Sequence, residues 1–162
     1  METVQQLFDY RLQNMYTAEY DLLDLLQELA LESGNLRLRR AFAEQHNQTL
    51  RHIKRLERIF KIRGRQPSEI RSPEMEGIIR MRRTFSEERP TPLIRDIFNY
   101  EVGQKIQNFQ IASYETLTNL ALRLDMEPVV KLLRDNLQEE KTALYALGLL
   151  VRRDGRDGEQ AA

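Results

Sequence analysis

The sequence predicts an all-α fold, a four-helix bundle with a long crossover that carries a short extra helix. Apolar residues recur every three or four positions in four long segments, which is the period of one helix face. The composition agrees, because 41% hydrophobic and 31% charged residues with only 7 Gly and 5 Pro favour a helix-rich soluble domain. A chain of 162 residues is long enough for one domain with a substantial core and short for two.

The first two helices are predicted over residues 3–33 and 36–63, joined by a tight link. The apolar stripe of the first helix contains Leu7, Phe8, Leu12, Met15, Leu22, Leu23, Leu26 and Leu29. Gly34 suits the end of this helix because it can take a left-handed conformation, and Asn35 can cap the next one. The stripe of the second helix contains Leu38, Phe42, Ile53, Leu56 and Phe60, and Gly64 ends it.

A hydroxyl residue followed by proline predicts the start of each of the next two helices. Ser72 precedes a proline and begins a short helix over about 74–85. Thr91 also precedes a proline and opens a long helix over about 92–123. A tight link then leads into the last long helix, over about 129–152, which carries Val130, Leu133, Leu137, Leu144, Leu147 and Leu150.

The four long helices form two antiparallel hairpins, because each tight link is only a few residues long. The connection of residues 64–91 can return along a helix of about 28 residues, or about 42 Å. Two hairpins joined by one long crossover have the connectivity of ferritin-like bundles. We expect a single domain over 1–152 and a polar, Gly-rich, disordered tail over 153–162.

What the sequence lacks disfavours several classes of function. Lys plus Arg and Asp plus Glu both number 25, so no overall basic charge favours nucleic acid. There is no cysteine, which excludes disulfides, thiolate zinc sites and cysteine nucleophiles. No segment is long and apolar enough to span a membrane and no signal peptide is recognisable, so we expect a cytoplasmic protein. Phosphate-loop, dinucleotide and metalloprotease motifs are also absent.

Polar side chains interrupt the apolar stripes near the middle of the predicted bundle. Glu19 and Glu140 each have apolar residues three or four positions away on both sides, so both carboxylates project toward the core. The other long helices place in the same region Gln48, His52, Gln107, Gln110 and Tyr114. Either carboxylate alone could reach solvent along its helix. Together these residues indicate a polar layer across the middle, where bundles build metal or cofactor sites.

The composition of this layer argues against a di-metal centre. Such a centre in a bundle uses four carboxylates and two imidazoles, whereas two carboxylates, one imidazole and at least three amides are present here. A neutral amide is a poor ligand for a hard cation, but it can donate hydrogen bonds to a carboxylate. We therefore predict a hydrogen-bonded core with no cofactor and no catalytic residue. The alternative is an iron or manganese site at Glu19, His52 and Glu140, aided by Glu101 or Glu44.

Five short motifs occur in an order and spacing that are known from one protein family. They are Tyr16-Thr-Ala-Glu19, Ala41-Phe42 with Thr49 and Ile53-Lys-Arg-Leu56, Met75-Glu-Gly77-Ile78, Ile111-Ala-Ser-Tyr114-Glu-Thr116-Leu117, and Glu139-Glu140-Lys141. In these motifs the chain resembles the YciF-like ferritin-like family, small bacterial stress-associated proteins of unsettled biochemical function. The resemblance covers about residues 4–150 and implies a ferritin-like bundle that is often dimeric.

The chain departs from this family in the region of the family's metal site. Family members have Val-Glu-His-Tyr-Glu-Ile-Ala where this chain has amides at Gln107 and Gln110 and Asn at 108. They have His-Leu-Glu-Glu-Thr where this chain reads Gln-His-Asn-Gln-Thr over 45–49. These near-isosteric changes preserve packing and remove charge, so the resemblance implies a scaffold that has lost its metal chemistry.

The function expected from these observations is that of a non-catalytic, stress-related structural or interaction protein. The resemblance implies a homodimer, and an unidentified protein partner is a further expectation. Three basic clusters, over 37–40, 51–65 and 80–83, are interpreted as solvated helix faces paired with Glu. The alternative is a basic rim for an anionic partner. Neither a membrane nor nucleic acid is favoured as a partner.

Overall fold

The chain folds into five helices in the computed structural model, which describes residues 1–68 and 70–159 and, over 151–159, the helix without its side chains. The helices are α1 (Val4–Glu32), α2 (Leu36–Ile62), α3 (Pro73–Glu87), α4 (Pro92–Arg123) and α5 (Glu127–Glu159). The described residues contain no β-strand. The all-α prediction and the order of its helices are confirmed, and the starts of the helices agree with the prediction to within two residues.

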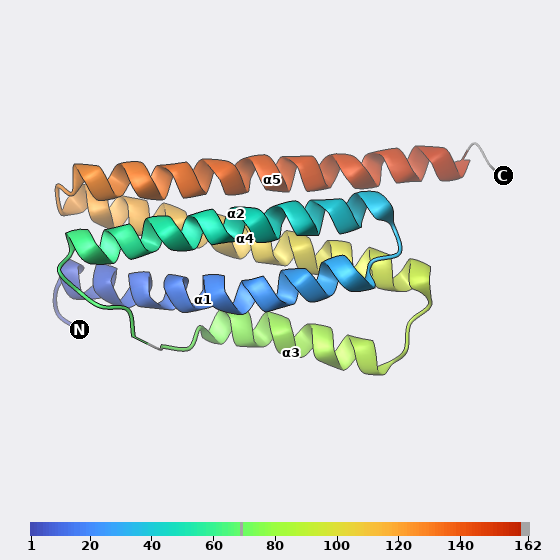
Figure 1. Cartoon of the computed structure of the whole chain (residues 1–162), viewed down its shortest axis with the longest axis horizontal. Coiled ribbons are helices and arrows are strands. Elements are labelled where there is room, and N and C mark those ends of the chain that lie inside the picture. The colour runs from blue at the N-terminus through green and yellow to red at the C-terminus, as the bar shows by residue number, and fades with distance from the viewer. Residues whose placement is uncertain (69, 160–162) are drawn as a thin grey trace.

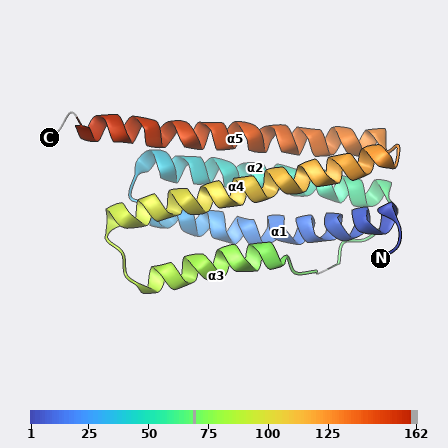
Figure 2. The same ribbon diagram turned by 180° about the vertical axis from the view of Figure 1, so that it is seen from behind.

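The long helices lie side by side as two hairpins (Figures 1 and 2). Helix α1 packs against α2 and α4, and α5 packs against the same two helices. Because α2 and α4 run in the same direction, the chain between them must return along the bundle. Helix α3 lies on that return path, outside the seam of α1 and α4 (Figure 2). The predicted ferritin-like connectivity, with a crossover that carries a short helix, is therefore confirmed.

Helix ends follow the local signals with two exceptions. Asn35 caps α2 by accepting from the backbone N–H of residues 37 and 38, and Gly64 ends it with a positive φ of 61°. Gly34, however, has no positive φ, so its predicted left-handed role is wrong. The chain instead leaves α1 through an extended Ser33. Thr91 is the N-cap of α4 but makes no side-chain capping bond.

The carboxylate of Asp96 on α4 holds the α1–α2 link in place. It accepts from the backbone N–H groups of Gly34 and Asn35 at 2.8 and 2.7 Å, so it ties the start of α4 to the α1–α2 link. A Cβ atom on Gly34 would lie 3.3 Å from this carboxylate. The glycine thus leaves room for a close approach between two segments that are far apart in sequence.

Two apolar clusters fill the bundle, one toward each end. One contains Phe8, Leu12, Met15, Leu56, Ile59, Phe60, Tyr114, Leu117, Ala121, Val129, Val130 and Leu133. The other contains Ala18, Leu22, Leu25, Leu26, Leu29, Leu38, Phe42, Met75, Val102, Ile106 and Leu147. On each long helix, the stretch between its members of the two clusters holds polar residues. Burial of the clusters drives folding, and they hold that polar middle in place.

The last helix is longer than predicted. It continues to Glu159, so the prediction of a disordered tail from residue 153 is wrong for 153–159, whereas 160–162 lie outside the described residues. A glycine inside a helix costs only about 1 kcal/mol relative to alanine and no proline follows Pro128, so nothing in the sequence stops the helix at 152. No helix in the described part of the chain is long and apolar enough to cross a membrane.

Candidate functional site

The residues predicted for the polar layer are all buried. Glu19, His52 and Gln107 have no exposed surface, and Gln48, Gln110, Tyr114 and Glu140 are at most 7% exposed. They come from all four long helices, and each lies on the inward stripe of its helix. Most of them lie between the two apolar clusters, whereas Tyr114 belongs to the first cluster and Glu19 follows Ala18 of the second. Buried polar groups are tolerated only when they are paired, so the partners of each group determine what the layer can do.

Glu19 on α1 accepts hydrogen bonds from two side chains of α4. The Nε2 atom of Gln110 lies 3.2 and 3.1 Å from its two carboxylate oxygens. The hydroxyl of Tyr114, one turn further along α4, donates to Oε1 of Glu19 at 2.5 Å. The same hydroxyl accepts from Nδ2 of Asn136 on α5 at 3.0 Å. Glu19 is thus bonded directly to α4 and, through the hydroxyl of Tyr114, linked to α5.

Glu140 on α5 meets the layer from the opposite side. The Nε2 atom of Gln48 donates to its Oε1 at 3.3 Å. The Nδ1 atom of His52 lies 3.3 Å from the same oxygen and 3.5 Å from Glu19, without the alignment of a hydrogen bond to either. His52 therefore sits between the two acids, close enough for its charge to interact with either one when that acid is ionised. Its ring also contacts the edge of Tyr114, with centroids 5.6 Å apart.

Three residues that the sequence analysis did not single out complete the layer. Nε2 of His52 lies 3.2 Å from the carboxylate of Glu139, which is part-exposed. Arg55 donates to Glu139 at 2.6 Å and to Oδ1 of Asn136 at 2.9 Å. The contacts therefore close a ring that runs from Glu19 through His52, Glu139, Arg55, Asn136 and Tyr114 back to Glu19.

Helical spacing could have revealed one of these residues. Asn136 lies three positions after Leu133 and four before Glu140, so it belongs to the inward stripe of α5 and is fully buried. Arg55 and Glu139 lie at the edges of their helices, where both side chains are about three-quarters buried. Only the register of α2 against α5 brings these two together, and the sequence carries no signal for that register.

Gln107 does not make the bridge that was expected of it. It is buried, but neither its Nε2 nor its Oε1 atom has a hydrogen-bond partner in the described residues. Gln107 lies one turn before Gln110 and next to Ile106, a member of the second apolar cluster. Glu44 and Glu101, the helpers of the alternative metal site, are exposed, and Glu101 pairs with Lys105 on the surface.

Burial and neighbouring charges shift the protonation of the layer. Burial raises the pKa of Glu140 to about 8, and the opposing influence of His52 does not cancel it. Burial by itself lowers the pKa of His52, but the surrounding carboxylates, led by Glu19, outweigh burial and raise it above its ordinary value. Burial and the charge of Glu19 raise the pKa of Tyr114 well above 10. At neutral pH, Glu140 and Tyr114 are thus mainly protonated.

The residues of the layer do not fit the di-metal centre of related bundles. Both oxygens of Glu19 already accept N–H or O–H groups, which point at the positions where a cation would have to bind. The amide groups of Gln48 and Gln110 present nitrogen rather than oxygen to the acids. In the described residues, no group of three or more His, Asp or Glu side chains is arranged to hold a metal ion.

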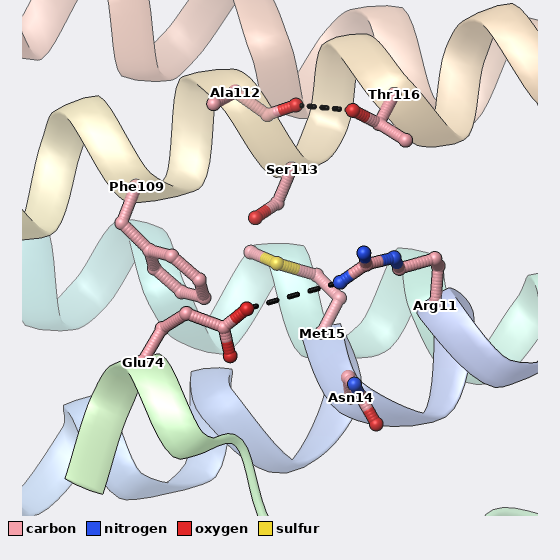
Figure 3. Close-up of a pocket in the computed structure, with 8 residues that line it drawn as sticks. All are labelled: Arg11, Asn14, Met15, Glu74, Phe109, Ala112, Ser113 and Thr116. Carbon is pink, nitrogen blue, oxygen red and sulfur yellow. Dashed lines mark hydrogen bonds and ion pairs between the residues drawn. The ribbon is translucent and has the colours of Figure 1, made fainter. Parts of the chain in front are cut away.

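Two surface hollows flank the layer. A cavity of about 230 Å³ lies between α1, α4 and the start of α3, where Phe109, Ser113 and Met15 line it and an ion pair between Arg11 and Glu74 borders it (Figure 3). None of the buried acids lines this cavity. A groove of about 580 Å³ between α2 and α5 does reach the layer, because Gln48 and Glu139 line it.

The chain is similar in sequence and structure to several known proteins. The curated Escherichia coli K12 protein YciF is 30% identical over 142 residues, which cover 87% of this chain and 86% of YciF. The crystal structure of the E. coli stress protein YciF superimposes with a TM-score of 0.91 at 29% identity, covering 96% of this chain and 99% of that one. YcfI from Rhodopseudomonas palustris gives a TM-score of 0.88 at 27% identity, covering 91% of this chain and 94% of YcfI.

The five sequence motifs predicted a resemblance to the YciF-like family, and these comparisons confirm it over most of the chain. Residues 3–156, nearly the whole chain, also match the model of one protein family. This protein belongs to the family described as a domain of unknown function, DUF892.

Proposed function

We propose that this protein is a non-catalytic helical bundle whose polar layer works without a metal ion, and that it serves as a structural or interaction protein in the stress response. The observation that carries the proposal is the bonding of Glu19. Gln110 and Tyr114 direct N–H and O–H donors at its oxygens, where a metalloprotein would place a cation.

The polar layer is suited to a structural role. A buried carboxylate without partners is costly, whereas a connected network of donors and acceptors is tolerated and fixes how its members lie. Here the network joins α1, α2, α4 and α5 through groups that fit only one helix register. The layer thus selects one arrangement of the four helices, which the apolar clusters alone would specify less strictly.

An exposed apolar end of the bundle supports a role in protein interaction. Large aliphatic side chains are exposed at the end of α1, at the start of α2 and at the start of α4, namely Leu31, Leu36, Leu93, Ile94 and Ile97. The contact of Asp96 with Gly34 and Asn35 brings these segments together. Grouped apolar residues of this kind mark interaction surfaces. We assign the surface to a homodimer contact, and place the protein in the stress response by analogy with YciF, which is called a stress protein. The cytoplasmic location expected from the sequence stays part of this proposal.

Metal analysis and thermal melts test the metal-independent layer. After purification without a chelator, we expect no stoichiometric metal and no rise in Tm with Fe(II), Mn(II) or Zn(II), because a ligand bound only by the native state must stabilise it. Stoichiometric metal would contradict the proposal if its effect on Tm is lost in Glu19→Gln and kept in Glu87→Gln, at an exposed position on α3 outside the alternative site. That result would favour the site at Glu19, His52 and Glu140.

Light scattering tests the interaction surface separately. We expect the parent protein to be a dimer, and the double substitution Leu93→Ser with Ile97→Ser to shift it toward the monomer. Leu50→Ser, which also removes an exposed aliphatic side chain but on α2, should leave the dimer unchanged. A parent that stays monomeric at high concentration, or a dimer insensitive to the double substitution, would show that this end of the bundle is not the interface.

A further inference from the structure

A second groove is lined by residues near the end of α2 and the start of α5, and it meets the polar layer only at Arg55. The end of α2 and the start of α5 lie at the same end of the bundle in Figure 1. The volume of the groove is about 570 Å³, which is within the range of small-molecule sites. It is lined by Lys54, Arg55, Arg58, Ile62, Pro128, Lys131, Leu132 and Asp135. The lining therefore combines cations from two helices with three apolar residues.

The positive charge of this groove is largely unopposed. Arg55 is engaged by Glu139 and Asn136. Lys54, Arg58 and Lys131 are exposed and form no ion pair with any part of the chain that the structure describes. Asp135 is the single carboxylate in the lining, so three unpaired cations face one acid. In a chain with no net charge, this is a local basic site rather than part of a general field.

Acidic side chains limit the basic groove on two sides. On one side Glu139 neutralises it through contacts with Arg51 and Arg55. On the other side Asp9 pairs with both Arg63 and Arg65 beyond the end of α2. A polymer such as nucleic acid is bound along an extended row of cations, which these acids interrupt. The groove is therefore better suited to a compact anion than to a nucleic acid strand.

The lining defines the chemistry of that anion. Lys and Arg side chains bind phosphate oxygens through charge-assisted hydrogen bonds. The apolar residues Ile62, Pro128 and Leu132 offer a surface for a flat or apolar group next to the phosphates. We propose that this groove binds a compact phosphate ester with two or more negative charges, of the nucleoside diphosphate class. The groove shares Arg55 with the polar layer, but Arg55 is already engaged by Asn136 and Glu139, so the proposal rests on Lys54, Arg58 and Lys131 and not on the metal-free layer or the dimer surface.

Calorimetry on the full-length protein tests this site with three probes: ADP without magnesium, inorganic pyrophosphate, and a twelve-base single-stranded DNA. We expect saturable binding of ADP at one site, weaker binding of pyrophosphate, and no binding of the DNA that competes with ADP. The affinity for ADP should fall as salt rises, because cations of the groove carry the contact.

Substitutions locate the binding. Lys54→Gln with Lys131→Gln should weaken ADP binding at least about tenfold, since two charge-assisted contacts are lost. Arg80→Gln with Arg83→Gln removes two exposed cations from α3 and should change the affinity less than about twofold, and Tm shows whether each variant is folded. Absence of saturable ADP binding, an equal loss in both variants, pyrophosphate binding as tight as ADP, or preferential binding of the DNA would each overturn the assignment.

Discussion

Glu19 on α1 and Gln110 on α4 face each other across the bundle, so that one amide nitrogen lies 3.2 and 3.1 Å from the two carboxylate oxygens. In this position the amide gives a buried carboxylate two contacts without adding charge. Tyr114 supplies a further donor from the same helix. The pair shows how a bundle can retain a core acid where a carboxylate at position 110 would require a cation.

Gln110→Glu should therefore destabilise the protein. The substitution removes a donor from Glu19 and places a second carboxylate against it, and we expect a loss of about 3 kcal/mol in the free energy of unfolding at pH 7, measured with urea. Gln104→Glu, on the same helix but only half-buried, should cost much less. Adding Mn(II) should restore part of the loss in the double variant with Gln107→Glu. Equal effects of the substitutions at 104 and 110 would mean that the amide–acid contact does not stabilise the fold.

Tyr114→Phe tests the hydroxyl that links three helices. Removing it leaves Glu19 with one fewer donor and Nδ2 of Asn136 without an acceptor, both in a buried environment. We expect a loss of about 1–3 kcal/mol in the free energy of unfolding, the usual cost of unpaired buried polar groups. Tyr145→Phe, at a residue that is 70% exposed, serves as the control and should be neutral. If Tyr114→Phe is also neutral, the hydroxyl is not held by the network.

The stability of the protein should fall as pH rises toward 8. The pKa of Glu140 is raised from 4.5 to about 8 in the folded chain, so between these values the folded state keeps a proton that the unfolded state has lost. Each pH unit in this window lowers the free energy of unfolding by about 1.4 kcal/mol. His52 acts in the same direction above pH 6.5, because its pKa is also raised.

Glu140→Gln isolates the contribution of the acid. Gln cannot titrate, so the free energy of unfolding should become flatter with pH between about 5 and 8, leaving only the part due to His52. Glu44→Gln, at an exposed position, should keep the slope of the parent protein. Urea melts across this range give the slopes directly. A parent protein that gains stability over the same interval would rule out a protonated Glu140 in the folded state.

The bundle and its order of helices could be predicted from sequence because both depend on local signals. The helical period of the apolar residues predicts the helices, and Asn35 and Ser72 mark where two of them begin. The length of the connection between the hairpins predicts the crossover. The conformation of Gly34 could not be predicted, because the carboxylate that accepts from its backbone N–H belongs to Asp96, which lies far along the chain. The end of α5 was missed because glycine weakens a helix without ending it.

The polar layer was predictable only in part for a related reason. Helical spacing shows which side chains turn inward, and it pointed to Glu19, Gln110 and Glu140. It does not give the axial register of one helix against another. Gln107 shares the inward stripe but finds no bonded partner, whereas Arg55 reaches the layer from the edge of its helix. Pairing of buried groups depends on this register, which is a property of the assembled bundle.

Close packing at Gly103 gives a final prediction, which concerns how α4 fits between α2 and α5. A Cβ atom at this position would lie 2.9 Å from Phe42 on α2 and 3.1 Å from Leu147 on α5, closer than packed side chains allow. Gly103→Ala should therefore cost about 1–3 kcal/mol in the free energy of unfolding, although alanine is the better helix former. Gly77→Ala on α3 meets no atom within 4 Å and should instead gain up to about 1 kcal/mol. Urea unfolding of the two variants separates steric cost from helix propensity. A Gly103→Ala protein as stable as the Gly77→Ala protein would show that α4 can move away from its neighbours without loss.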